Sequence, residues 1–309
     1  MKYDHVLLVG HGGPRQRDEV MPFLEAITAA KQVSELRLAQ IVGHYESIGG
    51  SSPYHAQVLG FADKLEQMLR EHGIGLPVFT GMKYWHPFLK DVLEDIQAKG
   101  RKRGLAIPLT AYRSAAAGAG YQENLESLKS SLRLAGLEHR FIDGWSSHTL
   151  YIEAQADEIS HTLAEIGEDG RKVTTILFSF HSLPVKRNSS NSRCPYLDEA
   201  CAAGTKIAER LNHARFQIVF QSIPEAAEGE WLGPDIADIV RRLAHYGEKR
   251  MLIAPVGFFC DHVEILYDLD DRLRQTAEEL KIGYFRAGTV IHNPKLIDLF
   301  EELIRSALI

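Results

Sequence analysis

Three carboxylates in one short stretch are spaced so that they could act together. Glu264, Asp268 and Asp271 stand at positions i, i+4 and i+7, so a helix would place all three on one face. Like charges at this spacing repel each other and cost stability, and we therefore expect something cationic near that face. The stretch follows an apolar run at 251–256 that is typical of a buried strand. Open α/β sheets bind their ligands at the carboxyl ends of such strands.

A histidine from another loop is the expected partner of this acidic face. His181 ends a second apolar run and is followed by a turn at 182–184. A histidine that faces carboxylates can bind a divalent metal or pass protons, and the residues alone leave both roles open. Beside the carboxylates, we expect His262 to support Glu264 at the start of the helix. We expect Asp261 to cap that helix through its side-chain oxygen.

The composition is that of an ordinary globular chain. Of its 309 residues, 45% are hydrophobic and 25% are charged, with a net charge of −6. No basic stripe with interleaved aromatic residues indicates nucleic-acid binding. The three cysteines, Cys194, Cys201 and Cys260, favour a reducing compartment over a disulfide framework. Without a signal peptide or an apolar run long enough to span a bilayer, we expect a cytoplasmic protein, and nothing requires more than a monomer.

Apolar runs alternate with helical patterns along the chain, which predicts parallel sheets covered on both faces. The strands are expected at 6–10, 39–45, 77–81, 105–109, near 141, and at 173–180, 215–221, 250–256 and 283–289. The helices are expected at 18–31, 54–72, 147–166, 195–212, 232–246, 262–280 and 294–308. Two more are expected to end near 98 and near 135.

The two halves of the chain resemble each other. The matching segments are 8–14 with 178–184, 45–48 with 220–223, and 81–86 with 257–262. Because the three matches occur in the same order, they predict two similar doubly wound α/β domains with four-stranded parallel sheets and a cleft between them. We place the domains at 1–144 and 145–293.

This repeat would put four histidines at equivalent strand ends, all facing the cleft. They are His11, His86, His181 and His262. Aromatic residues, including Trp85, are abundant in the same loops, and a flat hydrophobic ligand with acidic groups could use them. Arg15, Arg113, Lys186 and Arg187 are the cations that could hold such groups, although Lys186 and Arg187 are better explained as solvated surface charges. Dinucleotide and P-loop signatures are missing from the sequence.

Six separated motifs carry a resemblance to a known family. They lie at 45–53, 81–88, 178–184, 221–222, 231–234 and 255–268. On these motifs the chain resembles the ferrochelatases, which insert ferrous iron into a porphyrin in haem synthesis, and the match covers nearly the whole sequence. The coproporphyrin-type branch is slightly favoured.

The resemblance implies a class II chelatase-like fold with the porphyrin in the cleft between the domains. His181 and Glu264 would be the central pair, with His181 as metal ligand or acceptor of pyrrole protons. Asp268 and Asp271 would relay iron or protons along the helix. A planar porphyrin must bend to expose its nitrogen lone pairs, and the cleft would supply that strain. The last helix, about 294–309, would pack back on the first domain.

The resemblance also suggests which residues contact the porphyrin. Tyr45, Ser52 and Tyr121 match family positions, whereas His11 and His44 stand where coproporphyrin-using relatives usually have a tyrosine and often an arginine. To these we add Arg15, Trp85 and Arg113 as expected contacts. The acidic loop at 223–230 is a further departure from the family pattern.

The family's chemistry implies ferrous iron as a substrate, with no prosthetic group and no iron–sulfur cluster. The expected partners are porphyrin, ferrous iron and other enzymes of the haem pathway. Two other functions are compatible with the residues: a cobalt or nickel chelatase acting on another tetrapyrrole, and a two-lobed haem- or metal-binding protein without turnover.

Overall fold

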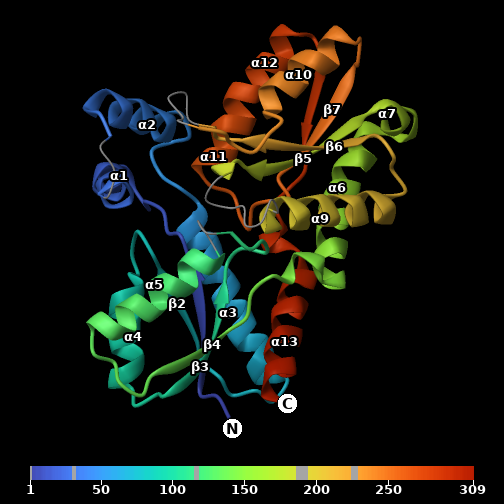
Figure 1. Ribbon diagram of the computed structural model, residues 1–309. Helices are drawn as coiled ribbons and strands as arrows, with labels where there is room; N and C mark the ends of the chain where they lie inside the picture. Colours follow the sequence, from blue (N-terminus) through green and yellow to red (C-terminus); the bar gives the residue numbers. More distant parts are fainter. Residues whose placement is uncertain (1, 30–32, 115–117, 186–193, 224–228) are drawn as a thin grey trace.

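The computed structural model describes residues 2–29, 33–114, 118–185, 194–223 and 229–309, and contains two parallel sheets (Figure 1). The first sheet has the order β2-β1-β3-β4, and its strands are β1 (His5–Gly10), β2 (Val78–Met82), β3 (Arg103–Pro108) and β4 (Glu138–Phe141). The second has the order β6-β5-β7-β8, with β5 (Thr175–His181), β6 (Phe216–Gln221), β7 (Arg250–Ala254) and β8 (Gly283–Arg286). The prediction of two similar four-stranded parallel sheets is confirmed. The division of domains at residues 144 and 145 stays a prediction.

Helices cover both sheets. Those of the first half are α1 (Val20–Thr28), α2 (Glu35–Ser47), α3 (Tyr54–Glu71), α4 (Leu89–Ala98) and α5 (Gly118–Ser131). Those of the second half are α6 (Thr149–Ile166), α7 (Glu168–Val173), α9 (Pro195–Leu211), α10 (Ile236–His245), α11 (Val263–Leu266), α12 (Arg274–Glu279) and α13 (Pro294–Leu308). No helix in the described part of the chain has the length and apolarity needed to cross a bilayer.

Alternating side chains of the central strands serve the two faces of each sheet. Val6 and Leu8 of β1 belong to one buried cluster and Leu7 and Val9 to another, as expected for a parallel strand covered on both sides. The cluster that holds Val6 and Leu8 continues into the second half, where Phe178 of β5 also belongs to it. One apolar core therefore joins the two sheets.

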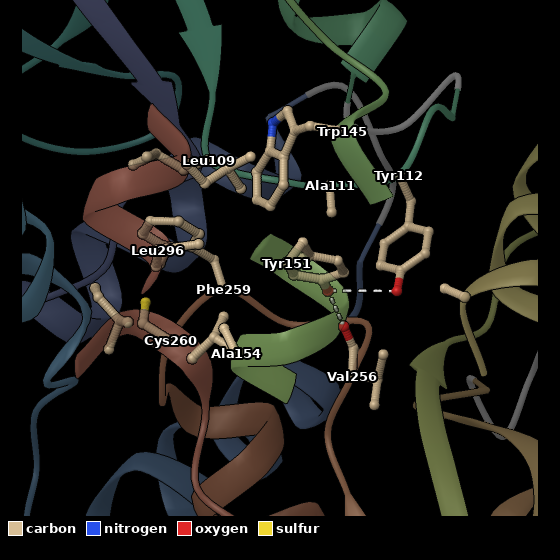
Figure 2. Close-up of a cluster of buried hydrophobic side chains, with 14 of the residues drawn as sticks. Leu109, Ala111, Tyr112, Trp145, Tyr151, Ala154, Val256, Phe259, Cys260 and Leu296 are labelled. Atoms are coloured by element: carbon tan, nitrogen blue, oxygen red, sulfur yellow. Dashed lines mark hydrogen bonds between the residues drawn. The ribbon is translucent and has the colours of Figure 1, made fainter. Parts of the chain in front are cut away.

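The centre of that shared core lies where the loops after β3 and β7 meet (Figure 2). Tyr151 of α6 donates a hydrogen bond to the carbonyl of Val256 at 2.7 Å, and its hydroxyl lies 3.3 Å from that of Tyr112. Helix α13 contributes Leu296 to the same cluster. Near its middle, α13 contacts the end of α3, where Glu301 Oε1 lies 2.7 Å from Nδ1 of His72. These contacts hold the strand ends of the two sheets in fixed relation.

One strand prediction is wrong. The segment 39–45 lies inside α2, where Leu38, Ile41, Val42 and Tyr45 follow a helical spacing and pack in one apolar cluster. The short apolar run hid this period of 3.6 residues. Ser34 begins the helix by accepting a hydrogen bond from the Arg37 amide. The predicted end of the preceding helix, at 30–31, lies outside the described residues.

Two of the three repeat matches are also wrong. Tyr45 is in a helix whereas Phe220 is in β6, and Gly81 is in β2 whereas Gly257 follows β7. Strands β2 and β7 lie on opposite sides of the central strands β1 and β5, so His86 and His262 are not equivalent. The first match is correct, because His11 follows β1 and His181 ends β5. Short matches of this kind do not reveal that α1 and α2 are inserted before the crossover helix α3.

Candidate active site

The carboxyl end of β5 presents His181 to Glu264 of α11. His181 Nδ1 lies 2.5 Å from the Ser182 carbonyl, and Nε2 lies 3.3 Å from Glu264 Oε1. The Tyr196 hydroxyl donates to the backbone carbonyl of His181 at 3.1 Å. The side chains of His181 and Glu264 are 34% and 35% exposed. The pair is therefore held by backbone contacts on its buried side and remains accessible to a ligand on its exposed side. The structure thus brings together the two residues that the sequence placed at the centre of the site.

Electrostatics makes this contact an ion pair. Burial alone would lower the pKa of His181, but the charge and hydrogen bond of Glu264, the Ser182 carbonyl and the charge of Asp268 together raise that pKa to about 9. Burial also acts to raise the pKa of Glu264, yet His181 and then His262 hold it well below its usual range. His262 Nε2 lies 3.3 Å from Glu264 Oε2, which gives the support expected of it. At neutral pH His181 is therefore an imidazolium beside an ionised Glu264.

Asp268 is the second carboxylate of the site. Burial, followed by the charge of Glu264, raises its pKa to about 6. The Ser222 hydroxyl donates to Asp268 at 2.7 Å, and Ser222 has φ 62°, in the left-handed region that non-glycine residues rarely occupy. The preceding residue, Gln221, donates to the backbone carbonyl of Glu264 at 2.7 Å. The end of β6 thus holds both acidic residues.

The single helix predicted at 262–280 is interrupted. Between α11 and α12 the chain forms a π-helix at Asp268–Leu273, in which the Arg272 amide donates to the Tyr267 carbonyl at 2.9 Å. Single π turns are frequent at functional sites. The wider turn changes the spacing beyond Asp268, and Asp271 accepts a hydrogen bond from Gln275 at 2.5 Å. Of the three carboxylates expected on one face, only Glu264 and Asp268 therefore influence each other's charge.

Asp261 does not cap the helix, contrary to the prediction. His262 occupies the capping position, without a capping hydrogen bond from its side chain. The Asp261 carboxylate instead lies 3.4 Å from Arg286 Nη1 and 3.5 Å from the Thr289 hydroxyl. The cation beside Glu264 is His181. Arg286 of β8 is a second cation, which pairs with Asp261 and Asp270 and which sequence reasoning missed.

Two predicted porphyrin contacts from the first half of the chain feel the charge of Glu264. The rings of His11 and Tyr84 are tilted at 52°, with centroids 4.7 Å apart, and Tyr45 is 4% exposed. Burial lowers the pKa of His11, partly opposed by the charge of Glu264. Burial, and then the charge of Glu264, raises the pKa of Tyr45. His11 and Tyr45 therefore lie close enough to Glu264 to feel its charge.

His44 closes one edge of the site. Its ring stacks on Tyr267 with centroids 3.8 Å apart and an interplanar angle of 15°. This contact joins α2 to the segment between Glu264 and Asp268. Val263 strengthens the same junction by packing against the apolar cluster beneath α1 and α2.

Three residues expected to touch the porphyrin are engaged elsewhere. Trp85 is 8% exposed and donates to Glu19 at 2.8 Å. Arg15 also binds Glu19, and the Arg15 hydrogen bond is the main reason that the pKa of Glu19 falls to about 2. Arg113 pairs with Glu199 at 3.1 Å, linking the loop after β3 to α9. We assign these three contacts to the scaffold.

Ser52 and Tyr121 are buried rather than displayed. Ser52 is 7% exposed, and a side chain at Gly13 would lie only 3.3 Å from it. Tyr121 of α5 is 6% exposed and packs in the same cluster as Leu7 and Val9 of β1. Lys186, Arg187 and most of the 223–230 loop lie outside the described residues.

A preformed metal centre is not seen in the described ranges, where no three histidine, cysteine, aspartate or glutamate side chains gather in a metal-holding arrangement. His181 and Glu264 could supply one imidazole and one carboxylate to a borderline dication. Such a ligand pair suits a metal that arrives and leaves as a substrate.

The Ser222 contact predicts a measurable effect on Asp268. Replacing Ser222 with Ala or Gly removes a hydrogen bond to the ionised carboxylate, so we expect the pKa of Asp268 to rise above about 6. Because Gly also relieves the backbone strain, equal shifts in both variants would assign the effect to the hydroxyl. Carboxyl-carbon NMR titration of labelled aspartate, assigned with Asp268→Asn, measures this pKa. An unchanged pKa in both variants would contradict the assignment.

The same pKa affects stability in a defined direction. The folded chain holds the Asp268 proton more tightly than an ordinary aspartate of pKa 3.8 does. Ionising this group therefore reduces the free energy of unfolding as the pH rises from about 3.8 through 6.

Known proteins are similar to this chain over nearly all of its length. A family model described as Ferrochelatase matches residues 3–308. Coproporphyrin III ferrochelatase of Streptomyces coelicolor is 33% identical over 320 residues, covering 98% of this chain and 84% of that protein. Ferrochelatase of Herpetosiphon aurantiacus is 31% identical over 300 residues, covering 97% of each.

Solved structures of chelatases share the fold. SirB from Bacillus subtilis with Fe3+ aligns with a TM-score of 0.59 and 12% identity, covering 98% of this chain and 95% of that one. CbiX, the terminal enzyme for biosynthesis of siroheme in denitrifying bacteria, aligns with a TM-score of 0.52 and 16% identity. At these identities the likeness concerns the fold alone. Taken with the family model across residues 3–308 and the sequence relatives, the paired sheets and their facing strand ends place the chain in the ferrochelatase family.

Proposed function

We propose that coproporphyrin III is the porphyrin into which this ferrochelatase inserts ferrous iron, and that His181 and Glu264 carry the reaction. The observation that supports these roles is the ion pair between the two side chains, at 3.3 Å and accessible at the end of β5. The choice of porphyrin rests on the relatives named coproporphyrin III ferrochelatase.

The charge state of the pair suggests an order of events. An imidazolium with a pKa of about 9 cannot accept a proton at neutral pH. When ferrous iron reaches Glu264, it replaces the imidazolium as the partner of the carboxylate. The charge of Glu264 that raised the pKa of His181 is then compensated, so burial favours the neutral imidazole and His181 releases its proton to solvent. A neutral His181 can take a proton from a pyrrole nitrogen.

The proton balance requires a second acceptor. Inserting Fe2+ into a porphyrin forms bonds to the ring nitrogens and releases two pyrrole protons. His181 can receive them one at a time if each proton is passed on. Asp268, with a pKa of about 6 and a position next to Glu264 along the helix, is suited to take the proton and return it to solvent.

The grip on the macrocycle is assigned to aromatic side chains around the pair. His11 and Tyr84 form one ring contact and His44 and Tyr267 another. Flat rings can hold a porphyrin face by stacking. Lys83, whose ammonium lies 5.0 Å from the Tyr84 ring centroid, adds a cation that could meet a propionate.

Replacing the histidine tests its role directly. In His181→Ala we expect anaerobic iron insertion to slow by about 10²–10⁴-fold, the usual contribution of a positioned acid or base. Porphyrin binding, followed by fluorescence quenching, should stay within about twofold because the stacking rings remain. His161→Ala, on the exposed face of α6, is the matched control. Near-normal turnover in His181→Ala would rule out the assigned role.

The porphyrin preference is tested by comparing coproporphyrin III with protoporphyrin IX. Anaerobic insertion of ferrous iron is followed by absorbance with each porphyrin. Each extra propionate that meets a charged donor is worth about 1.5–3 kcal/mol, so we expect kcat/KM to be about tenfold or more higher for coproporphyrin III. A preference for protoporphyrin IX would overturn the porphyrin assignment but not the chemistry. No turnover with either would overturn both.

A further inference from the structure

The segment that carries the two reactive carboxylates has an unusual concentration of acid. Asp261, Glu264, Asp268, Asp270 and Asp271 fall within eleven consecutive positions. The sequence expectation concerned the carboxylates that face the cleft. In the structure the five carboxylates fall into two groups, because Asp261 and Asp270 pair with a cation on β8.

That cation is Arg286, at the end of β8. Its Nε donates to Asp270 at 2.8 Å, and its Nη1 lies 3.4 Å from Asp261. The same Nη1 donates to the carbonyl of Ala287 at 3.2 Å. The Arg286 side chain is 17% exposed, and those of Asp261 and Asp270 are 23% and 22% exposed. One guanidinium thus bridges two carboxylates that flank Glu264 and Asp268 in the sequence.

Neighbouring contacts fix the same segment to the same strand. The Tyr284 hydroxyl donates to the carbonyl of Leu269, inside the π-helix, at 2.8 Å. The Asp261 amide donates to Gln57 of α3 at 3.1 Å, which ties the start of the segment to the first half of the chain. Arg286 lies between these two anchors.

The two partners of this ion pair respond differently to burial. Burial raises the pKa of Asp270, and Arg286 only partly opposes it. The pKa of Arg286 is raised, because Asp261 and Asp270 together outweigh its burial. Buried ion pairs of this kind contribute little net stability, and fixing one conformation is a role that some of them serve.

We propose that Arg286 is a positioning residue, which bridges Asp261 and Asp270 so that the segment between them holds Glu264 and Asp268 toward the site. The expected effect of Arg286 on iron insertion rests on the proposed function. The claim that Arg286 holds the segment in place does not depend on it. A guanidinium is required because only its planar fork can meet two carboxylates in a defined geometry.

The test compares Arg286→Gln with a matched control. Arg241→Gln removes an arginine from an exposed pair with Asp238 on α10, in the same half of the chain. Two experiments are done well below the melting temperature: steady-state kinetics of anaerobic iron insertion, which give kcat and KM, and backbone hydrogen exchange. The key amide is that of Arg272, which donates to Tyr267 across the π turn.

In Arg286→Gln we expect exchange at the Arg272 amide to become about tenfold or more faster, while amides of β5 and β7 keep their protection. We expect kcat to fall about 10–100-fold, since a displacement of about 1 Å at reacting groups can cost that much. KM for the porphyrin should change by less than about twofold, because the stacking rings are untouched. Arg241→Gln should change none of these.

Two further variants keep the test decisive if Arg286→Gln folds poorly. Arg286→Lys keeps the charge but loses the fork, so we expect a smaller increase in exchange at the Arg272 amide and a smaller loss of kcat than in Arg286→Gln. In Asp270→Asn/Arg286→Gln we expect no greater loss than in Arg286→Gln alone, because the two residues act through one contact.

Three outcomes would overturn the proposal. One is unchanged exchange at Arg272, and another is faster exchange throughout the second sheet, which would make Arg286 a general stabiliser. The third is a local change in exchange with normal kcat. If the wild-type protein fails to turn over porphyrin, the proposed function fails, while the exchange data still decide whether Arg286 holds the segment.

Discussion

The site depends on one electrostatic contact, the ion pair between His181 and Glu264. The two opposite charges are in contact, and each side chain is partly exposed, so that a metal ion or a substrate can reach it. The contact costs the desolvation of both groups, and their mutual attraction, aided by Ser182 and Asp268 at His181 and by His262 at Glu264, outweighs this cost. An arriving dication competes for the carboxylate, so the pair links iron binding to the protonation state of the histidine.

The carboxyl edge of the second sheet positions both members of this ion pair, and the carboxyl edge of the first sheet lies opposite it. His181 is the last residue of β5 and Glu264 follows β7, the neighbouring strand in the same sheet. The first sheet brings His11 from the end of β1 to face them. Because one apolar core runs through both sheets, the facing edges are held by the same packing that stabilises the chain.

The sequence predicted structure best where the pattern that specifies it lies within one short segment. Apolar runs predicted eight strands that exist, and the spacing of Glu264 and Asp268 predicted two neighbouring carboxylates. It failed for segment 39–45, because a short apolar run does not distinguish a strand from one face of a helix. The π turn at Asp268–Leu273 and the Arg286 bridge were also missed. The π turn rests on a hydrogen bond between residues five apart, Arg272 and Tyr267, which the regular i, i+4, i+7 spacing of the carboxylates does not predict. The Arg286 bridge joins residues 16 and 25 positions apart, which helical spacing does not encode.

The most direct measurement is the protonation state of His181 in the metal-free protein. Imidazole NMR over a pH titration, with His181 assigned by comparison with a variant that lacks it, reports the midpoint of this one group. The account predicts a midpoint near 9, so that His181 is charged at neutral pH. A midpoint at or below the ordinary value of 6.5 would mean that burial dominates. It would contradict the ion pair and the order of events built on it.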